Sequence, residues 1–197
     1  LMAAVANVRR MFDLDANPAA IAAGLSRDPA LTQLLEDYPG VRSPGSWSCF
    51  EATVRAVVGQ QVSTSAARNV LSKLAAQGAR SDARVFPGAA AIASLPDAAF
   101  AMPGRRRETL LALCRDYSDR EQELRVEALA ERRGIGPWTV AIASMRGAGN
   151  PDAIPVTDLG LRNAWAALAQ DDELAERARH WQPWRSYAAN LLWRSLT

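Results

Sequence analysis

The sequence predicts an all-α protein with about ten helices joined by short connections. Apolar residues recur at helical spacing along most of the 197-residue chain. No segment alternates apolar and polar residues convincingly over the length of a strand, and runs of β-branched residues are absent. Because prolines and glycines interrupt the helical patterns, we expect many short helices rather than a few long ones.

Composition restricts the classes of function. Apolar residues make up 49% of the chain, which indicates a folded protein. The sequence contains no uninterrupted run of 18 apolar residues, so it predicts no membrane-spanning helix. Cys49 and Cys114 are expected to be reduced core thiols of a cytosolic protein. The single histidine, His180, excludes a histidine-based zinc site. A net charge of +2 permits nucleic-acid binding without requiring it. The start at Leu1-Met2 resembles that of an excised domain.

The first half of the chain carries clear signals for helix starts. Asn17-Pro18 and Asp28-Pro29 each combine an N-cap residue with a proline at the first helical position. After a loop, another helix is expected over residues 47–59, capped by Ser46 or Ser48. Glu51 stands where a capping box with Ser48 requires it. A helix starting at residue 63 or 64 should pack against this one as an αα-hairpin.

The second half is predicted to contain shorter helices. Residues 83–103 are expected to form short helices separated by Pro87, Pro96 and Pro103. A helix is expected after the triple arginine at 105–107, ending near Tyr117, and another over 124–132 with Ala130 facing inward. The last predicted helices cover residues 138–146, a segment beginning near Asp158, residues 172–181 and residues 184–196.

A glycine turn, Arg133-Gly134-Ile135-Gly136-Pro137, separates two helical patterns. Gly134 and Gly136 allow positive φ and close approach of another backbone. Pro137 suits the first turn of a helix, whose unpaired N–H groups and positive dipole end can hold an anion. Thr139 could add a hydroxyl to such a site. A purely structural turn would explain the same residues, so both interpretations remain open.

A single carboxylate, Asp158, stands at the start of a predicted helix whose apolar stripe begins at Leu159. Asp158 can be the helix cap. Thr157 could cap the helix equally well, which would leave Asp158 to face a cleft. A carboxylate at a helix N-terminus could there stabilise a developing cation or orient a water molecule.

Tryptophans gather in the same half of the sequence. Most are expected in the core, but one or two could line a pocket for a flat, electron-poor ligand. Five of the six follow residue 130, namely Trp138, Trp165, Trp181, Trp184 and Trp193.

Four motifs, in order, resemble those of the helix-hairpin-helix DNA glycosylases, most closely the 3-methyladenine DNA glycosylase II type of alkylation repair. They occupy residues 59–63, 133–139, 155–161 and 181–188. Four motifs in sequence are more specific than any one alone. The resemblance implies a catalytic domain over residues 1–197, without the family's β-rich N-terminal domain. It also implies two packed lobes with an active-site cleft between them.

The resemblance assigns roles around the turn and the carboxylate. Asp158 matches the family's catalytic aspartate. The amides of Gly134, Gly136 and Thr139 would hold a DNA phosphate, and no cofactor would be required for the chemistry. A monovalent cation, Na⁺ or K⁺, bridging to that phosphate would be held by the backbone carbonyls of Ala130, Arg132 and Ile135.

The resemblance also implies a base pocket and a wedge into the duplex. Trp138 and Trp193 match the aromatic walls of the pocket, and Leu159 stands where an aromatic residue is usual, which predicts a more open pocket. Gln60 and Gln61 would contact DNA. Gln61 occupies the position of the side chain that fills the gap left by the flipped nucleotide, where the relatives carry an apolar residue.

The implied activity is release of alkylated purines, such as 3-methyladenine and 7-methylguanine, from double-stranded DNA after base flipping. Family members that also cut the backbone use a lysine immediately after the hairpin. Because Trp138 stands there, the resemblance predicts a monofunctional enzyme that leaves an abasic site. Asp158 would stabilise the oxocarbenium-like sugar and direct water to it.

Alternatives are a glycosylase for an oxidised or deaminated base, or a non-catalytic DNA-binding module. We expect a monomer in the bacterial cytoplasm with no membrane association. We also expect Gly134→Ala to weaken DNA binding and base release without unfolding the protein.

Overall fold

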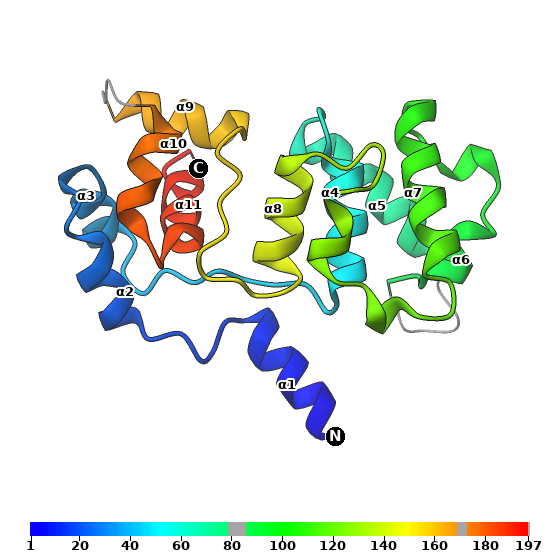
Figure 1. Cartoon of the computed structure of the whole chain (residues 1–197), viewed down its shortest axis with the longest axis horizontal. Coiled ribbons are helices and arrows are strands. Elements are labelled where there is room, and N and C mark those ends of the chain that lie inside the picture. Colours follow the sequence, from blue (N-terminus) through cyan, green and yellow to red (C-terminus); the bar gives the residue numbers. More distant parts are fainter. Residues whose placement is uncertain (79–85, 169–172, 197) are drawn as a thin grey trace. The chain divides into compact units, whose positions relative to one another are not determined.

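The computed structural model describes residues 1–78, 86–168 and 173–196, and within these ranges it contains eleven α-helices, four 3-10 helices and no strand (Figure 1). The all-α prediction is confirmed. No helix in the described part of the chain is long and apolar enough to cross a membrane. The chain divides into two compact units: unit 1 comprises Leu1–Trp47 and Ser144–Thr197, and unit 2 comprises Ser48–Ala143.

Unit 1 combines the first helices of the chain with the last ones around one hydrophobic core. Ile21, Leu31 and Trp181 are each at most 1% exposed in this core. Trp165 packs against Trp181 edge to face, with ring centroids 5.4 Å apart. The helical elements of unit 1, apart from the end of α8, are α1 (Met2–Met11), α2 (Pro18–Leu25), α3 (Pro29–Asp37), α9 (Leu159–Ala167), α10 (Leu174–Arg177), η4 (Ala178–Trp181) and α11 (Arg185–Arg194).

Both predicted proline-led helix starts of unit 1 are confirmed. The Asn17 side chain accepts hydrogen bonds from the amides of the first turn of α2. The Asp28 side chain caps α3 by accepting from Ala30 N at 3.0 Å. Asp28 is 4% exposed and also accepts from Arg177 Nε at 2.7 Å and from Trp181 Nε1 at 2.6 Å. Burial alone would raise the pKa of Asp28, but these hydrogen bonds outweigh it and hold the pKa below its usual range.

Asp28→Ala is therefore expected to destabilise unit 1 by about 3 kcal/mol, because it removes a cap and leaves buried donors without this acceptor. The lowered pKa means that the native state binds the proton less readily than the unfolded chain. The stabilisation by Asp28 is thus present at neutral pH and lost as pH falls through the native pKa. Thermal unfolding of wild type and variant at pH 7 and at acidic pH measures it. A melting-temperature difference that does not narrow in acid would contradict this account.

Unit 2 is built on α4, which carries buried residues along most of its length. Ser48 caps α4 by accepting from Glu51 N at 3.1 Å, as predicted. The helix α5 packs on α4, which confirms the αα-hairpin. The elements are α4 (Cys49–Gly59), α5 (Thr64–Gly78), α6 (Ala89–Ala93), η1 (Asp97–Ala99), α7 (Gly104–Asp116), η2 (Glu121–Glu123), η3 (Val126–Leu129) and the start of α8 (Pro137–Arg146), in which the boundary between the units falls.

Two element predictions in unit 2 differ from the structure. The helix expected after the triple arginine is present and ends at Asp116, next to Tyr117 as predicted, but it already begins at Gly104, because the carbonyl of Pro103 accepts hydrogen bonds from Arg106 N and Arg107 N. The helix expected over residues 124–132 is instead the 3-10 turn η3, and Ala130 is exposed. Backbone hydrogen bonds between residues three apart, rather than four apart, wind the chain more tightly between Arg125 and Arg132, just before the glycine hairpin.

Neither cysteine forms a disulfide. Cys114 is fully buried in the core of unit 2, and burial raises the pKa of its thiol to about 12. Cys114 is therefore an unreactive core residue, whereas Cys49 is only half-buried.

Candidate active site

The glycine hairpin belongs to unit 2, and its two glycines differ in their surroundings. Gly134 has φ +85°, and a Cβ there would lie 2.0 Å from Thr109 Oγ1 on α7. Only glycine fits this position. Gly136 has no atom within 4 Å of its would-be Cβ. Gly134 is therefore required for packing against α7, whereas the space beside Gly136 at the start of α8 is open.

Gln60, at the end of α4, fastens the hairpin from within the same unit. Its side-chain Nε2 donates to Gly134 O at 3.0 Å and to Thr139 Oγ1 at 2.9 Å. Thr139 is 1% exposed. The expectation that the Thr139 hydroxyl adds to an anion site was therefore wrong, because that hydroxyl is buried against Gln60. Its backbone amide still lies in the first turn of α8, where N–H groups lack an intrahelical acceptor.

Gln61 follows in a left-handed conformation with φ +52° and an exposed side chain. Positive φ is uncommon for a residue with a side chain and often marks a functional position. Trp138 is half-buried, and a Cβ added to Gly59 would lie 3.6 Å from its indole. The Trp138 ring thus lies against the end of α4. Gln60 and Gln61 directly follow this end of the helix in the chain.

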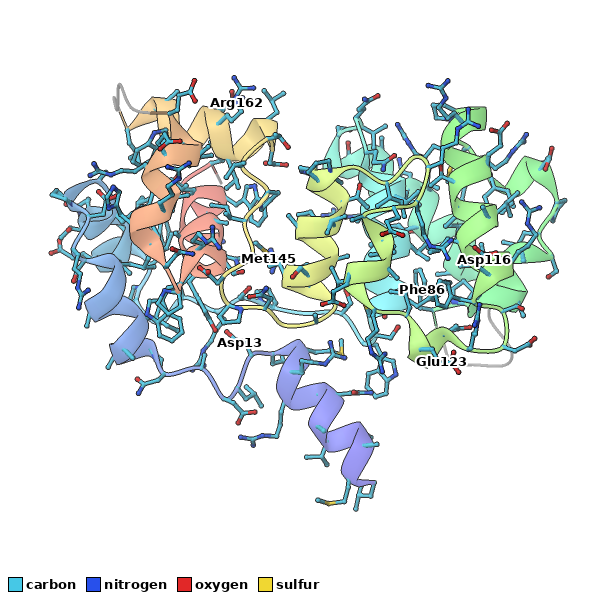
Figure 2. The ribbon with its side chains drawn as sticks, viewed as in Figure 1. Asp13, Phe86, Asp116, Glu123, Met145 and Arg162 are labelled. Atoms are coloured by element: carbon cyan, nitrogen blue, oxygen red, sulfur yellow. The ribbon has the colours of Figure 1, made fainter. Side chains whose placement is uncertain are left out.

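Backbone carbonyls predicted to bind a cation lie in the approach to the hairpin. Arg132 O accepts from Ile135 N at 3.1 Å within the turn, which leaves its second lone pair for another partner. Ile135 is 6% exposed and anchors the hairpin in the core of unit 2. The Arg132 side chain has a structural role. It pairs with Asp116, labelled on α7 in Figure 2, at 2.6 Å and stacks over Tyr117.

Asp158 belongs to unit 1 and is itself the N-cap of α9. Its Oδ1 accepts from Leu161 N at 2.9 Å and from Trp193 Nε1 at 3.0 Å. The suggestion that Thr157 could cap the helix in place of Asp158 was therefore wrong. Capping fixes the position of the carboxylate at the positive end of the helix. The role of helix cap is therefore compatible with the proposed role of stabilising a cation or orienting a water molecule.

Gly160 allows Asp158 and Trp193 to approach each other. A Cβ at Gly160 would lie 3.0 Å from Asp158 Oδ1 and 3.5 Å from Trp193 Nε1. Leu159, predicted to begin an apolar stripe, is 69% exposed instead of packed in the core. Trp193 is half-buried, and Arg146 lies over its ring at 5.4 Å from the centroid. Asp158, Gly160 and Trp193 thus form a compact cluster with Arg146 on one indole face.

Comparison with known proteins decides the family. A family model described as the AlkA N-terminal domain matches residues 1–48, which are helical or irregular here. The chain is 39% identical to a probable bifunctional transcriptional activator/DNA repair enzyme AlkA of Mycobacterium tuberculosis, covering all of this chain but only 43% of that relative. It is 31% identical to DNA-3-methyladenine glycosylase 2 of Escherichia coli, covering 96% of this chain and 70% of that protein.

The chain belongs to the helix-hairpin-helix DNA glycosylase superfamily. Its homologues are AlkA-like 3-methyladenine DNA glycosylases, as the motifs indicated. Solved structures of this superfamily share the fold. A 3-methyladenine DNA glycosylase of Archaeoglobus fulgidus matches with a TM-score of 0.80 at 21% identity over 96% of this chain and 73% of that one. One of Schizosaccharomyces pombe, in complex with abasic DNA, matches with 0.75 at 21% identity over 89% of this chain and 96% of that one.

The structure divides the main predicted site residues between the two units. Gln60, Trp138 and the hairpin lie together in unit 2, and Asp158 and Trp193 contact each other in unit 1. Sequence reasoning missed that Gln60 holds the hairpin, and it missed Arg146 altogether. Neither contact has a local signal, because the partners are separated by dozens of residues in the chain.

Proposed function

We propose that the chain is a monofunctional DNA N-glycosylase that releases alkylated purines from double-stranded DNA and leaves an abasic site. The observation that carries this proposal is the Asp158 carboxylate, held at the N-terminus of α9 by Leu161 N and Trp193 Nε1. A fixed carboxylate at this place suits stabilisation of a developing positive charge on the sugar. The family of the chain supports the same chemistry.

The reaction would begin with the target nucleotide turned out of the duplex, at a cost that is smaller for a damaged base. An N-alkylated purine already carries positive charge and leaves readily. Asp158 would stabilise the oxocarbenium-like sugar and direct a water molecule to it. One such preorganised group contributes about 3–4 kcal/mol to lowering the barrier.

The DNA backbone would be held by the hairpin. The amide of Gly136 lies directly before α8, where a Cβ would meet open space, and the amide of Thr139 lies in the first turn of that helix. Helix N-termini bind phosphate through such amides. Gln61 would fill the gap left in the duplex from its exposed, left-handed position. Carbonyl oxygens are the ligands of hard cations, and those of Ala130, Arg132 and Ile135 would hold Na⁺ or K⁺ next to the phosphate.

The damaged base would contact aromatic residues. Trp138 in unit 2 and Trp193 in unit 1 are each half-buried, so each indole has exposed surface for a base, and Leu159 exposes a large apolar side chain. A cationic base gains roughly 0.5–2 kcal/mol over an aromatic face relative to a neutral one. That preference is small, so selectivity would rest mainly on the weakened glycosidic bond of the damaged base.

A panel of duplexes tests lesion class and reaction type together. The purified chain is expected to release 3-methyladenine and 7-methylguanine, without strand cleavage and without a borohydride-trapped adduct, because Trp138 cannot form a Schiff base. Release of oxidised but not methylated purines would favour the alternative lesion class. Binding without release of any base would favour a DNA-binding module.

A further inference from the structure

Arg146 follows Met145, which is labelled in Figure 2, at the end of α8. Its guanidinium donates hydrogen bonds to two neutral acceptors. Nη1 donates to Pro44 O at 2.7 Å, and Nη2 donates to Asn190 Oδ1 at 2.8 Å. None of the ion pairs found among the described residues involves Arg146. Burial lowers the pKa of Arg146 to about 10, which leaves the guanidinium charged at neutral pH.

Arg146 is half-buried, and a cation that loses part of its hydration without a carboxylate partner is costly, so its presence calls for compensation. The face of Trp193 supplies part of it, since the guanidinium carbon lies 5.4 Å from the ring centroid. The same indole donates from Nε1 to Asp158 Oδ1 at 3.0 Å. The ring therefore contacts a cation on its face and a carboxylate at its N–H edge. A cation over the ring polarises the indole and strengthens its N–H as a donor.

We propose that Arg146 is a positioning residue that acts on the Asp158 carboxylate through Trp193, an inference that rests on the catalytic role proposed for Asp158. The guanidinium is held by Pro44 and Asn190, and the stack fixes the plane of the indole. The fixed indole directs Nε1 at Asp158 Oδ1. Because Arg146 covers one face of Trp193, only the rest of the ring is left to meet a base.

Arg146→Met tests the role, with Trp193→Phe, the double variant and Arg146→Lys beside it. Arg185→Met is the matched control: Arg185 is a partly buried arginine of unit 1 that pairs with Asp152 at 2.7 Å. We expect Arg146→Met to slow single-turnover release of 7-methylguanine about tenfold at unchanged DNA affinity, and Arg146→Lys to recover most of the loss. With phenylalanine at position 193, the methionine substitution should change the rate less than about twofold, because the donor is already gone.

A purely structural Arg146 gives different results. Arg146→Met and Arg185→Met would then lower the melting temperature alike and leave the release rate of the folded protein unchanged. An equal rate loss from Arg146→Met in both backgrounds would also overturn the inference. If Arg146→Met does not fold, Arg146→Gln, which also removes the positive charge, is carried through the same cycle with the same criteria. A wild-type protein that releases no base overturns the proposed function and this inference together, whereas an active wild type with unaffected variants overturns only the inference.

Discussion

Asp158→Asn is expected to lower the rate of alkylated-base release about 10²–10³-fold while leaving the fold intact. The reason lies in the double role of Asp158, which caps α9 and accepts from Trp193 through the same oxygen. Asparagine caps helices as well as aspartate does and keeps a side-chain oxygen for both donors. The substitution therefore removes the negative charge and little else. Release rate, DNA affinity and melting temperature are measured on the same preparation.

Asp158→Ala is the companion variant, because it removes both the charge and the cap. It should lose the same activity and in addition about 1 kcal/mol of stability. A rate for Asp158→Asn close to wild type, with Asp158→Ala inactive, would show that the cap and not the charge carries the activity.

Gly134→Ala is expected to destabilise unit 2 by about 3 kcal/mol or more. Its Cβ would lie 2.0 Å from Thr109 Oγ1, and φ is +85°. This corrects the expectation from sequence that the substitution would weaken DNA binding and base release without unfolding the protein. Thermal unfolding measures the effect. Combining it with Thr109→Ala should relieve the collision but leave the backbone strain of about 1 kcal/mol.

Gly136→Ala is the matched control and the better test of the phosphate grip. Its Cβ enters open space, so stability should stay within about 0.5 kcal/mol of wild type. DNA affinity should fall about tenfold, because the added methyl group occupies the open space through which the phosphate would approach the backbone amide. A stable Gly134→Ala protein, or Gly136→Ala protein with undiminished DNA affinity, would contradict the roles assigned to the two glycines.

Features that depend on neighbouring residues could be predicted from the sequence. The caps Asn17, Asp28 and Ser48 were recognised because a cap and its helix are adjacent in the chain. The hairpin was recognised from its glycines and proline. The choice between the two interpretations of Gly134 could not be made, because it depends on Thr109, which is far away in sequence.

The candidate site was predicted as a set of residues but not as a set of contacts. Gln60 was expected to bind DNA, yet its side chain holds Gly134 O and Thr139 Oγ1. Arg146 belongs to none of the sequence motifs. Its proposed role depends on its contact with Trp193, which lies in another helix. Such long-range contacts form in the folded core and leave no periodic pattern in the sequence.

The most direct test of the central claim is the single-turnover rate of 7-methylguanine release from duplex DNA, measured for wild type and Asp158→Asn at saturating protein. The catalytic role proposed for Asp158 predicts release by the wild type and a rate about 10²–10³-fold lower for the variant, at equal DNA affinity and melting temperature. Equal rates for the two proteins would contradict it.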